Sequence, residues 1–257
     1  MENKQINKII NNYFAEGIDN FLPNISINCV VLGYESPHLK VLVHKLPDFG
    51  EWMLPGGYVN RTESISDAAY RNLNLSGINQ VFLRQILTVG DAHRVHEISV
   101  ANIDETLENR KVAEWASQRF VTIVYYGLVN LASTEVVPGG LLGESKWLNV
   151  DHLETLFMDH ARIITETRTI LSIELLNHPV ASNLLPETFT LTELRGLFEA
   201  ILNRNIDRGT FRRKILKLGI IEQTEKTKDV KGQPTYLYKF NSAKYQQFLQ
   251  EQTKFGF

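Results

Sequence analysis

Residues 207–219 carry the side chains best suited to bind a polyanion. Phe211, Ile215 and Leu218 recur at helical spacing, so this segment predicts a helix with one apolar side. The rest of its surface holds Arg208, Arg212, Arg213 and Lys217. A helix with a basic outer face can enter the major groove of DNA, where Arg reaches guanine edges and phosphates.

A second basic group lies in the polar segment 225–234, which predicts a turn between two strands. A basic helix by itself is most simply explained as a solvated helix face. The combination of this basic helix with a basic turn between two strands favours a DNA-binding domain. The candidate DNA-binding residues are Arg208, Thr210, Arg212, Arg213, Lys214, Lys217, Lys226, Lys228 and Lys231.

The charge distribution agrees with this interpretation. The 257 residues hold 27 Lys+Arg and 29 Asp+Glu, a net charge of −2 that by itself predicts no polyanion partner. From Leu185 onward there are 13 Lys+Arg and 8 Asp+Glu, a net charge of +5, which leaves −7 for the preceding residues. An acidic part and a basic part suggest two domains with different roles.

A second constellation lies in the acidic part. Gly57 closes the loop Leu54-Pro55-Gly56-Gly57, and Glu63 and Arg71 follow it, the latter on a predicted helix over residues 64–75. Their spacing resembles the Nudix box, whose members hold a divalent metal against a diphosphate. The simpler interpretation, which we favour, is that the glycines shape a loop and that Glu63 pairs with Arg71.

The resemblance stops at the metal-binding half of that box. Asn72, Leu75 and Ser76 stand at the three positions where the family has glutamates, and Asp67 is not at a ligand position. We therefore expect no catalytic residues, no metal ligands and no cofactor. The candidate effector-binding residues are Gly57, Glu63, Arg71 and Tyr125, although Tyr125 lies in an apolar strand and is most simply a core residue.

A histidine pair in the long polar insert 91–117 offers another possible metal site. His93 and His96 are followed by Glu97, but this spacing differs from His-Glu-x-x-His and no third ligand is evident. Two exposed histidines are the better interpretation.

The elements that must position these residues fall into two groups. Residues 6–14 predict a helix. Strands are predicted at 25–33, 39–44, 51–59, 81–89, 120–131 and 146–150, with the helix 64–75 between them, and a long helix at 159–176. After a predicted linker at 181–186 come helices at 190–202 and 207–218 and strands at 219–224 and 235–240, which is a winged-helix arrangement.

The chain as a whole resembles the Nudix-related transcription regulators of the NrtR type. The resemblance rests on Leu54–Gly57, Trp147-Leu148, Asp159-His160, residues 184–186, 211–214 and 234–240. It implies an α+β fold, with a Nudix-like α/β/α sandwich followed by a winged helix-turn-helix. The predicted limits are a helical extension at 1–21, the effector-sensing domain at 22–178 and the DNA-binding domain at 179–257. The degenerate box is closer to the sugar-responsive branch.

The basic C-terminal domain predicts a transcription regulator that binds a double-stranded operator, and the resemblance implies that it acts as a homodimer. Its effector would be a sugar such as L-arabinose, or a nucleotide-sugar. The alternative is a Mg²⁺-dependent Nudix hydrolase of a nucleoside-diphosphate derivative such as ADP-ribose. The polar start of the chain, the lack of a run long enough to span a bilayer, and the single Cys29 predict a cytoplasmic protein without a membrane partner.

Overall fold

The computed structural model describes residues 19–45, 50–79, 81–95, 111, 114–136, 143–175, 180–230 and 233–253. The chain packs as two compact units that interleave along the sequence. The first comprises Met1–Val31, Val41–Gly127 and Glu135–Thr167, and the second comprises Leu32–Lys40, Leu128–Thr134 and Arg168–Phe257. The linear domain limits stay a prediction, and the predicted helix at 6–14 lies outside the described residues.

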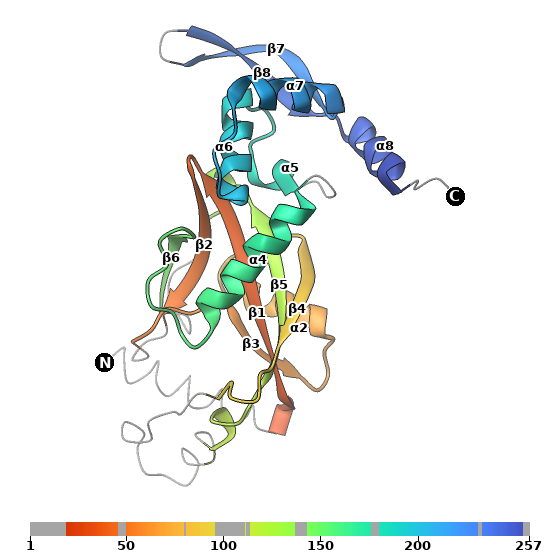
Figure 1. Ribbon diagram of the computed structural model, residues 1–257. Helices are drawn as coiled ribbons and strands as arrows, with labels where there is room; N and C mark the ends of the chain where they lie inside the picture. Colours follow the sequence, from red (N-terminus) through yellow and green to blue (C-terminus); the bar gives the residue numbers. More distant parts are fainter. Residues whose placement is uncertain are drawn as a thin grey trace. The chain divides into compact units, whose positions relative to one another are not determined.

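A sheet dominates the first unit, and its strands together with the helices of the chain agree with the α+β fold predicted for this chain (Figure 1). Its strand order is β4-β5-β1-β2-β6, and β3 pairs with β1 in antiparallel orientation. The strands are β1 (Phe21–Glu35), β2 (His38–Lys45), β3 (Gly56–Asn60), β4 (Leu83–Val89), β5 (Val121–Val129) and β6 (Glu144–Asn149). The central stretches of the long strands are almost entirely apolar, as is typical of strands that are covered on both faces. Fully buried residues there include Val30, Val41 and Val124.

Helix α2 (Ile65–Asn74) follows β3 and begins as the sequence predicts. The Ser64 hydroxyl accepts a hydrogen bond from Asp67 N and caps the helix. Ala68, Ala69 and Leu73 form its buried side, in agreement with their helical spacing.

Helix α4 (His160–Glu174) runs from the first unit into the second. Ile163, Ile164 and Leu171 are fully buried along it, which confirms the predicted apolar side. In the second unit, Arg168 donates hydrogen bonds to the carbonyl oxygens of Ala200 and Ile201 near the end of α6 (Leu191–Leu202). These carbonyls lie in the last turn of α6, where a helix leaves its acceptors without partners.

The core of the second unit is a winged helix. It comprises α5 (Val180–Leu184), α6, α7 (Arg208–Leu218), β7 (Ile221–Val230), β8 (Gln233–Phe240) and α8 (Ser242–Thr253). Phe189 is fully buried and pairs its backbone with that of Tyr238 through two hydrogen bonds. The stretch before α6 is thereby joined to the wing strand β8.

Two expectations about this unit were wrong, and one helix was not predicted. The predicted linker at 181–186 contains α5, whose Val180, Ala181 and Leu184 are buried at helical spacing. The predicted turn at 225–234 is mostly strand, because β7 continues to Val230 and pairs with β8 up to Gln233. Helix α8 was not predicted, since Tyr245 is one of the few apolar residues in its Gln-rich sequence.

Two short features complete the description. The 3₁₀ helix η2 (Leu131–Ser133) follows β5, and Leu131 packs so closely on Gly33 that a side chain at Gly33 would overlap it. Among the described residues, no helix is both long and apolar enough to cross a bilayer.

The capping box of α6 gives a stability prediction. Thr190 Oγ1 accepts from Glu193 N at 3.1 Å, and the Glu193 carboxylate accepts from Thr190 N at 2.7 Å. Thr190→Ala should lower the free energy of unfolding by about 1 kcal/mol, measured by urea denaturation. Thr192→Ala is the matched control, because the Thr192 hydroxyl makes no hydrogen bond within the described part of the chain. Equal stability of the two variants would contradict the cap.

Candidate DNA-binding surface and Nudix-like site

Helix α7 has the two faces that the sequence predicts. Phe211 and Ile215 are buried, and the Phe211 ring meets that of Phe198 on α6 edge to face, with centroids 5.3 Å apart. Asp207 caps the helix by accepting from Thr210 N at 2.8 Å. The helix therefore docks on α6 by one side and presents the other side to solvent.

The solvent side of α7 is basic. Its exposed residues include Arg208, Arg212, Arg213, Lys214 and Lys217, while Thr210 is half-buried. None of these five cations has an ion pair or a side-chain hydrogen bond with another described residue. Their charges are therefore available to an external anion.

The turn between α6 and α7 is fixed by an ion pair and two hydrogen bonds. Arg195 donates to the Ile206 carbonyl at 2.9 Å and lies 3.4 Å from the Glu199 carboxylate, which in turn accepts from Ile206 N. These contacts hold the two helices of the predicted helix-turn-helix against each other. The sequence analysis did not identify Arg195, although its i, i+4 spacing to Glu199 indicates the pair.

The predicted basic residues of the wing are placed only in part. Lys226 and Lys228 lie on β7 rather than in a turn, which corrects the prediction, and their side chains lie outside the description. Lys231 lies outside the described residues.

The surviving half of the Nudix box forms a structural pair, as expected. Two Arg71 nitrogens donate to the two Glu63 oxygens at 2.9 and 2.6 Å, and Glu63 also accepts from Asn60 N. The hydrogen bond with Arg71 and that with Asn60 lower the Glu63 pKa against the opposing effect of burial. Arg71 further donates to the Tyr58 carbonyl and so ties α2 to β3.

The three positions where the family has glutamates hold side chains that do not suit a divalent metal. Asn72 is buried and donates to the Ala68 carbonyl, and a side chain at Gly57 would overlap its amide oxygen. Leu75 is exposed, and Ser76 is fully buried against His44. Hard cations require several oxygen ligands, which this set lacks. Within the described ranges, no three His, Cys, Asp or Glu side chains gather in a metal-binding group.

His44 forms a neutral hydrogen-bond network with two serine hydroxyls. Its two ring nitrogens lie 2.8 Å from the hydroxyls of Ser145 and Ser76. Burial lowers the pKa of His44 to about 4, so the ring is neutral at pH 7. The sequence gives no signal for this contact, since its partners lie far apart along the chain.

Tyr125, the fourth candidate effector residue, is a core residue of β5. It is 5% exposed, and no hydrogen bond or ring contact joins it to the Glu63–Arg71 pair in the described structure. An aromatic cluster instead lies beside that pair, because the Tyr58 ring contacts those of Phe21, Trp115 and Phe120 at 4.5–5.3 Å. Sequence reasoning missed this cluster.

The start of α4 is bound to the Nudix-like loop. His160 is buried and its Nδ1 accepts from Leu54 N at 3.0 Å, and burial lowers its pKa to about 3. Arg94 Nε donates to both Asp159 carboxylate oxygens, at 3.0 and 3.1 Å. Neighbouring His93 is exposed, whereas His96, Glu97 and much of the insert 91–117 lie outside the described residues.

Comparison with known proteins agrees with this two-part geometry. Residues 181–240 match the family model of the NrtR DNA-binding winged helix domain. The crystal structure of Shewanella oneidensis NrtR in complex with a 27mer DNA aligns with a TM-score of 0.63, 24% identity, and coverage of 86% of this chain and 95% of that one. The chain has the NrtR-like fold.

Two further similarities extend over most of this NrtR-like chain. The ADPR responsive transcriptional repressor NtrR of Acinetobacter baylyi is 26% identical over 236 residues, which cover 85% of this chain and 82% of the relative. A MutT/nudix family protein from Enterococcus faecalis has a TM-score of 0.61 at 20% identity, with coverage of 91% and 98%. Both NrtR-like parts, the Nudix-like domain and the winged helix, are thus supported.

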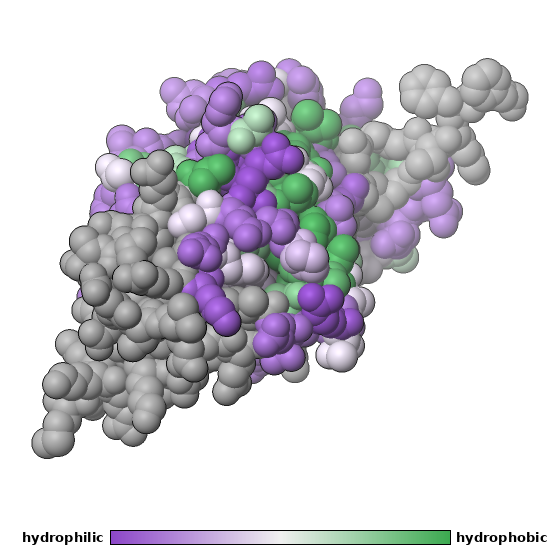
Figure 2. All heavy atoms as spheres, turned by 90° about the horizontal axis from the view of Figure 1, so that it is seen from below, coloured by the Kyte–Doolittle hydropathy of each residue, from purple (hydrophilic) through white to green (hydrophobic). Residues whose placement is uncertain are grey.

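The first unit exposes several large apolar side chains. They are Ile65, Tyr70 and Leu75 on or just after α2, and Phe82 before β4, which is 70% exposed. In the space-filling view from below, apolar side chains gather in a strip with hydrophilic ones beside it (Figure 2). Apolar surface of this kind is common where proteins associate.

The neutral His44 predicts a pH dependence of stability. Its pKa in the folded protein is about 4, below the ordinary value of 6.5, so between these values the unfolded chain binds the proton and the folded one does not. Stability should therefore fall as pH drops from about 6.5 towards 4, by up to about 1.4 kcal/mol per pH unit for this group. His160, whose pKa is lowered to about 3 by burial, should add to the loss of stability at low pH.

Urea denaturation at several pH values would measure this dependence. His44→Gln should flatten the loss, whereas the same change at the exposed His152 should not. An unchanged slope in His44→Gln would refute the role of His44.

Proposed function

We propose that this protein is a cytoplasmic, DNA-binding transcription regulator whose Nudix-like domain binds a small metabolite without hydrolysing it and thereby controls operator binding. The observation that carries the proposal is α7: five unpaired, exposed cations lie on a helix whose other face is buried in a domain that matches the NrtR DNA-binding model. A basic helix docked in this way suits the major groove, with the wing beside it.

The protein would act as a homodimer on an operator with two half-sites. A two-fold dimer presents two copies of α7, and an operator with two matching half-sites doubles the contacts. The exposed apolar side chains of α2 and the segment before β4 support association of two copies.

For the effector, we propose a nucleotide-sugar of the ADP-ribose type, with a free sugar such as L-arabinose as the second candidate. The relative in Acinetobacter baylyi is named for its response to ADPR, which supports the first. The Glu63–Arg71 pair stays partly exposed and offers charged and hydrogen-bonding groups, which a nucleotide-sugar requires.

Helix α4 is our candidate for the link between effector and DNA. One end of it is bound to the Nudix-like loop through His160 and Leu54, and Arg168 binds the end of α6 in the other unit. An effector that binds the DNA-free conformation more tightly than the DNA-bound one would shift the population away from DNA.

The first test is DNA binding by full-length protein to a duplex obtained by in vitro selection. Simultaneous change of Arg212 and Arg213 to Ala should weaken binding at least about 100-fold, since each residue is expected to contribute about 1–3 kcal/mol. Binding should also fall steeply with salt, and two chains should bind each duplex. Arg204→Ala, a change at an exposed residue in the turn after α6, is the matched control. Undiminished binding by the double variant would exclude α7 as the recognition helix.

The second test separates the regulator from a hydrolase. Incubation with Mg²⁺ or Mn²⁺ and ADP-ribose should give no turnover, because Asn72, Leu75 and Ser76 supply no carboxylate. The same ligand should weaken DNA binding, with L-arabinose as the parallel sample. Robust hydrolysis that disappears in Glu63→Gln would establish the Nudix hydrolase instead.

A further inference from the structure

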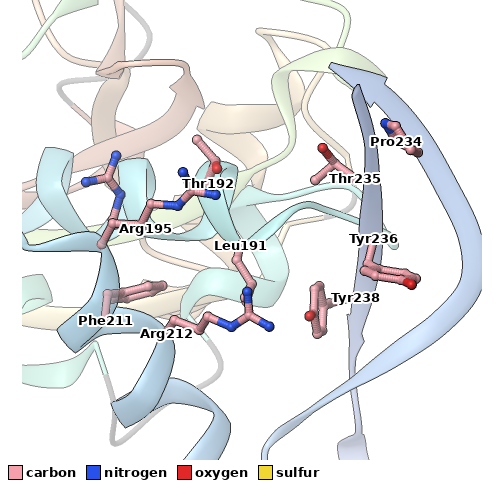
Figure 3. Close-up of a pocket in the computed structure, with 10 residues that line it drawn as sticks. Leu191, Thr192, Arg195, Phe211, Arg212, Pro234, Thr235, Tyr236 and Tyr238 are labelled. Carbon is pink, nitrogen blue, oxygen red and sulfur yellow. The ribbon is translucent and has the colours of Figure 1, made fainter. Parts of the chain in front are cut away.

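A hollow of about 200 Å³ lies within the winged helix, between the start of α6, the start of α7 and strand β8 (Figure 3). Its polar lining includes Thr192 and Arg195 from α6, Arg208 and Arg212 from α7, and Tyr238 from β8. Asp and Glu are absent from the residues that line it. The lining therefore holds three arginines, of which Arg208 and Arg212 have no ion pair among the described residues and Arg195 is paired with Glu199 behind it.

Tyr238 is one of the residues that line the hollow. The Tyr238 side chain is only 5% exposed, yet its hydroxyl has no hydrogen-bond partner among the described residues. That hydroxyl oxygen keeps some exposure to solvent. Figure 3 shows the Arg212 side chain extending towards Tyr238. A nearly buried donor without a partner is costly unless something outside the chain satisfies it.

Arg195 brings a cation that is already held in place. Its contacts with Ile206 and Glu199 fix the guanidinium at the edge of the hollow. Little side-chain entropy is then lost when it binds an anion.

The hollow also divides the basic face of α7. Arg208 and Arg212 are four residues apart and both line it, whereas Arg213 and Lys217, also four apart, do not. Residues four apart share one side of a helix, so two basic rows run along α7. One row faces the hollow beside the wing, and the other is free for the groove.

We propose that this hollow seats one phosphate of the DNA backbone, held by Arg195, Arg212 and the Tyr238 hydroxyl. The inference rests on the proposed function and deepens it, because it assigns the Arg208–Arg212 row to the backbone and leaves base recognition to the Arg213–Lys217 row. Cationic and hydroxyl donors around a concave site match the oxygens of a phosphodiester.

The experiment measures affinity and salt slope for the selected duplex and a mixed-sequence duplex. Arg195→Gln should weaken binding to both by about the same factor, roughly 10-fold, and reduce the salt slope by about 1. Tyr238→Phe, which keeps the buried ring, should weaken both by about 3-fold to 10-fold. Arg204→Gln, which removes a charge outside the hollow, is the control for the salt slope. Thermal denaturation of each variant shows whether it is folded.

Neutral methylphosphonate groups, placed one at a time in the selected duplex, locate the contact. One position per half-site should weaken wild-type binding about 10-fold and have little further effect on Arg195→Gln or Tyr238→Phe. If the hollow instead binds free inorganic phosphate, the variants will bind DNA like wild type. That result overturns this inference and leaves the proposed function standing. A loss confined to the selected duplex also overturns it, since it indicates base reading. If wild type binds neither duplex, the proposed function itself is wrong.

Discussion

The burial of Phe211 and Ile215 against α6 is the packing on which the DNA-binding surface depends. Because these two side chains fix which side of α7 faces inward, the Arg and Lys residues at the remaining positions must face outward. The docking also sets α7 beside the wing, since Phe189 joins the start of α6 to Tyr238 of β8. The burial of apolar side chains therefore determines that the Arg and Lys side chains of α7 face solvent, without ion pairs inside the domain.

In the Nudix-like part, by contrast, charged and polar side chains are bonded to one another instead of facing solvent. Where a Nudix hydrolase has carboxylates for metal, this chain has an amide that bonds its own helix and a hydroxyl that bonds His44. Glu63 and Arg71 remain, but they neutralise each other and hold α2 on β3. Helix α2 thus keeps its contact with β3, and the side chains at Asn72 and Ser76 make internal hydrogen bonds.

Long-range hydrogen bonds join the parts that local structure leaves separate. His160 reaches Leu54 across 106 residues, and Arg168 reaches the end of α6 across more than 30. Both lie on α4, a helix whose apolar spacing is evident in the sequence and whose polar contacts are not. The proposed communication between effector and DNA relies on those polar contacts.

The sequence by itself determined the order and type of the main elements, the two-faced α7, and the absence of carboxylates from the metal-binding positions of the Nudix box. These follow from periodicity, capping residues and residue identity, which are local properties. Only the tertiary structure decided that Tyr125 is core, that Lys226 and Lys228 lie in a strand, that α5 interrupts the linker, and that Arg195, Arg212 and Tyr238 line one hollow. Each of these depends on which distant segments pack together, and spacing along one chain carries no information about that pairing.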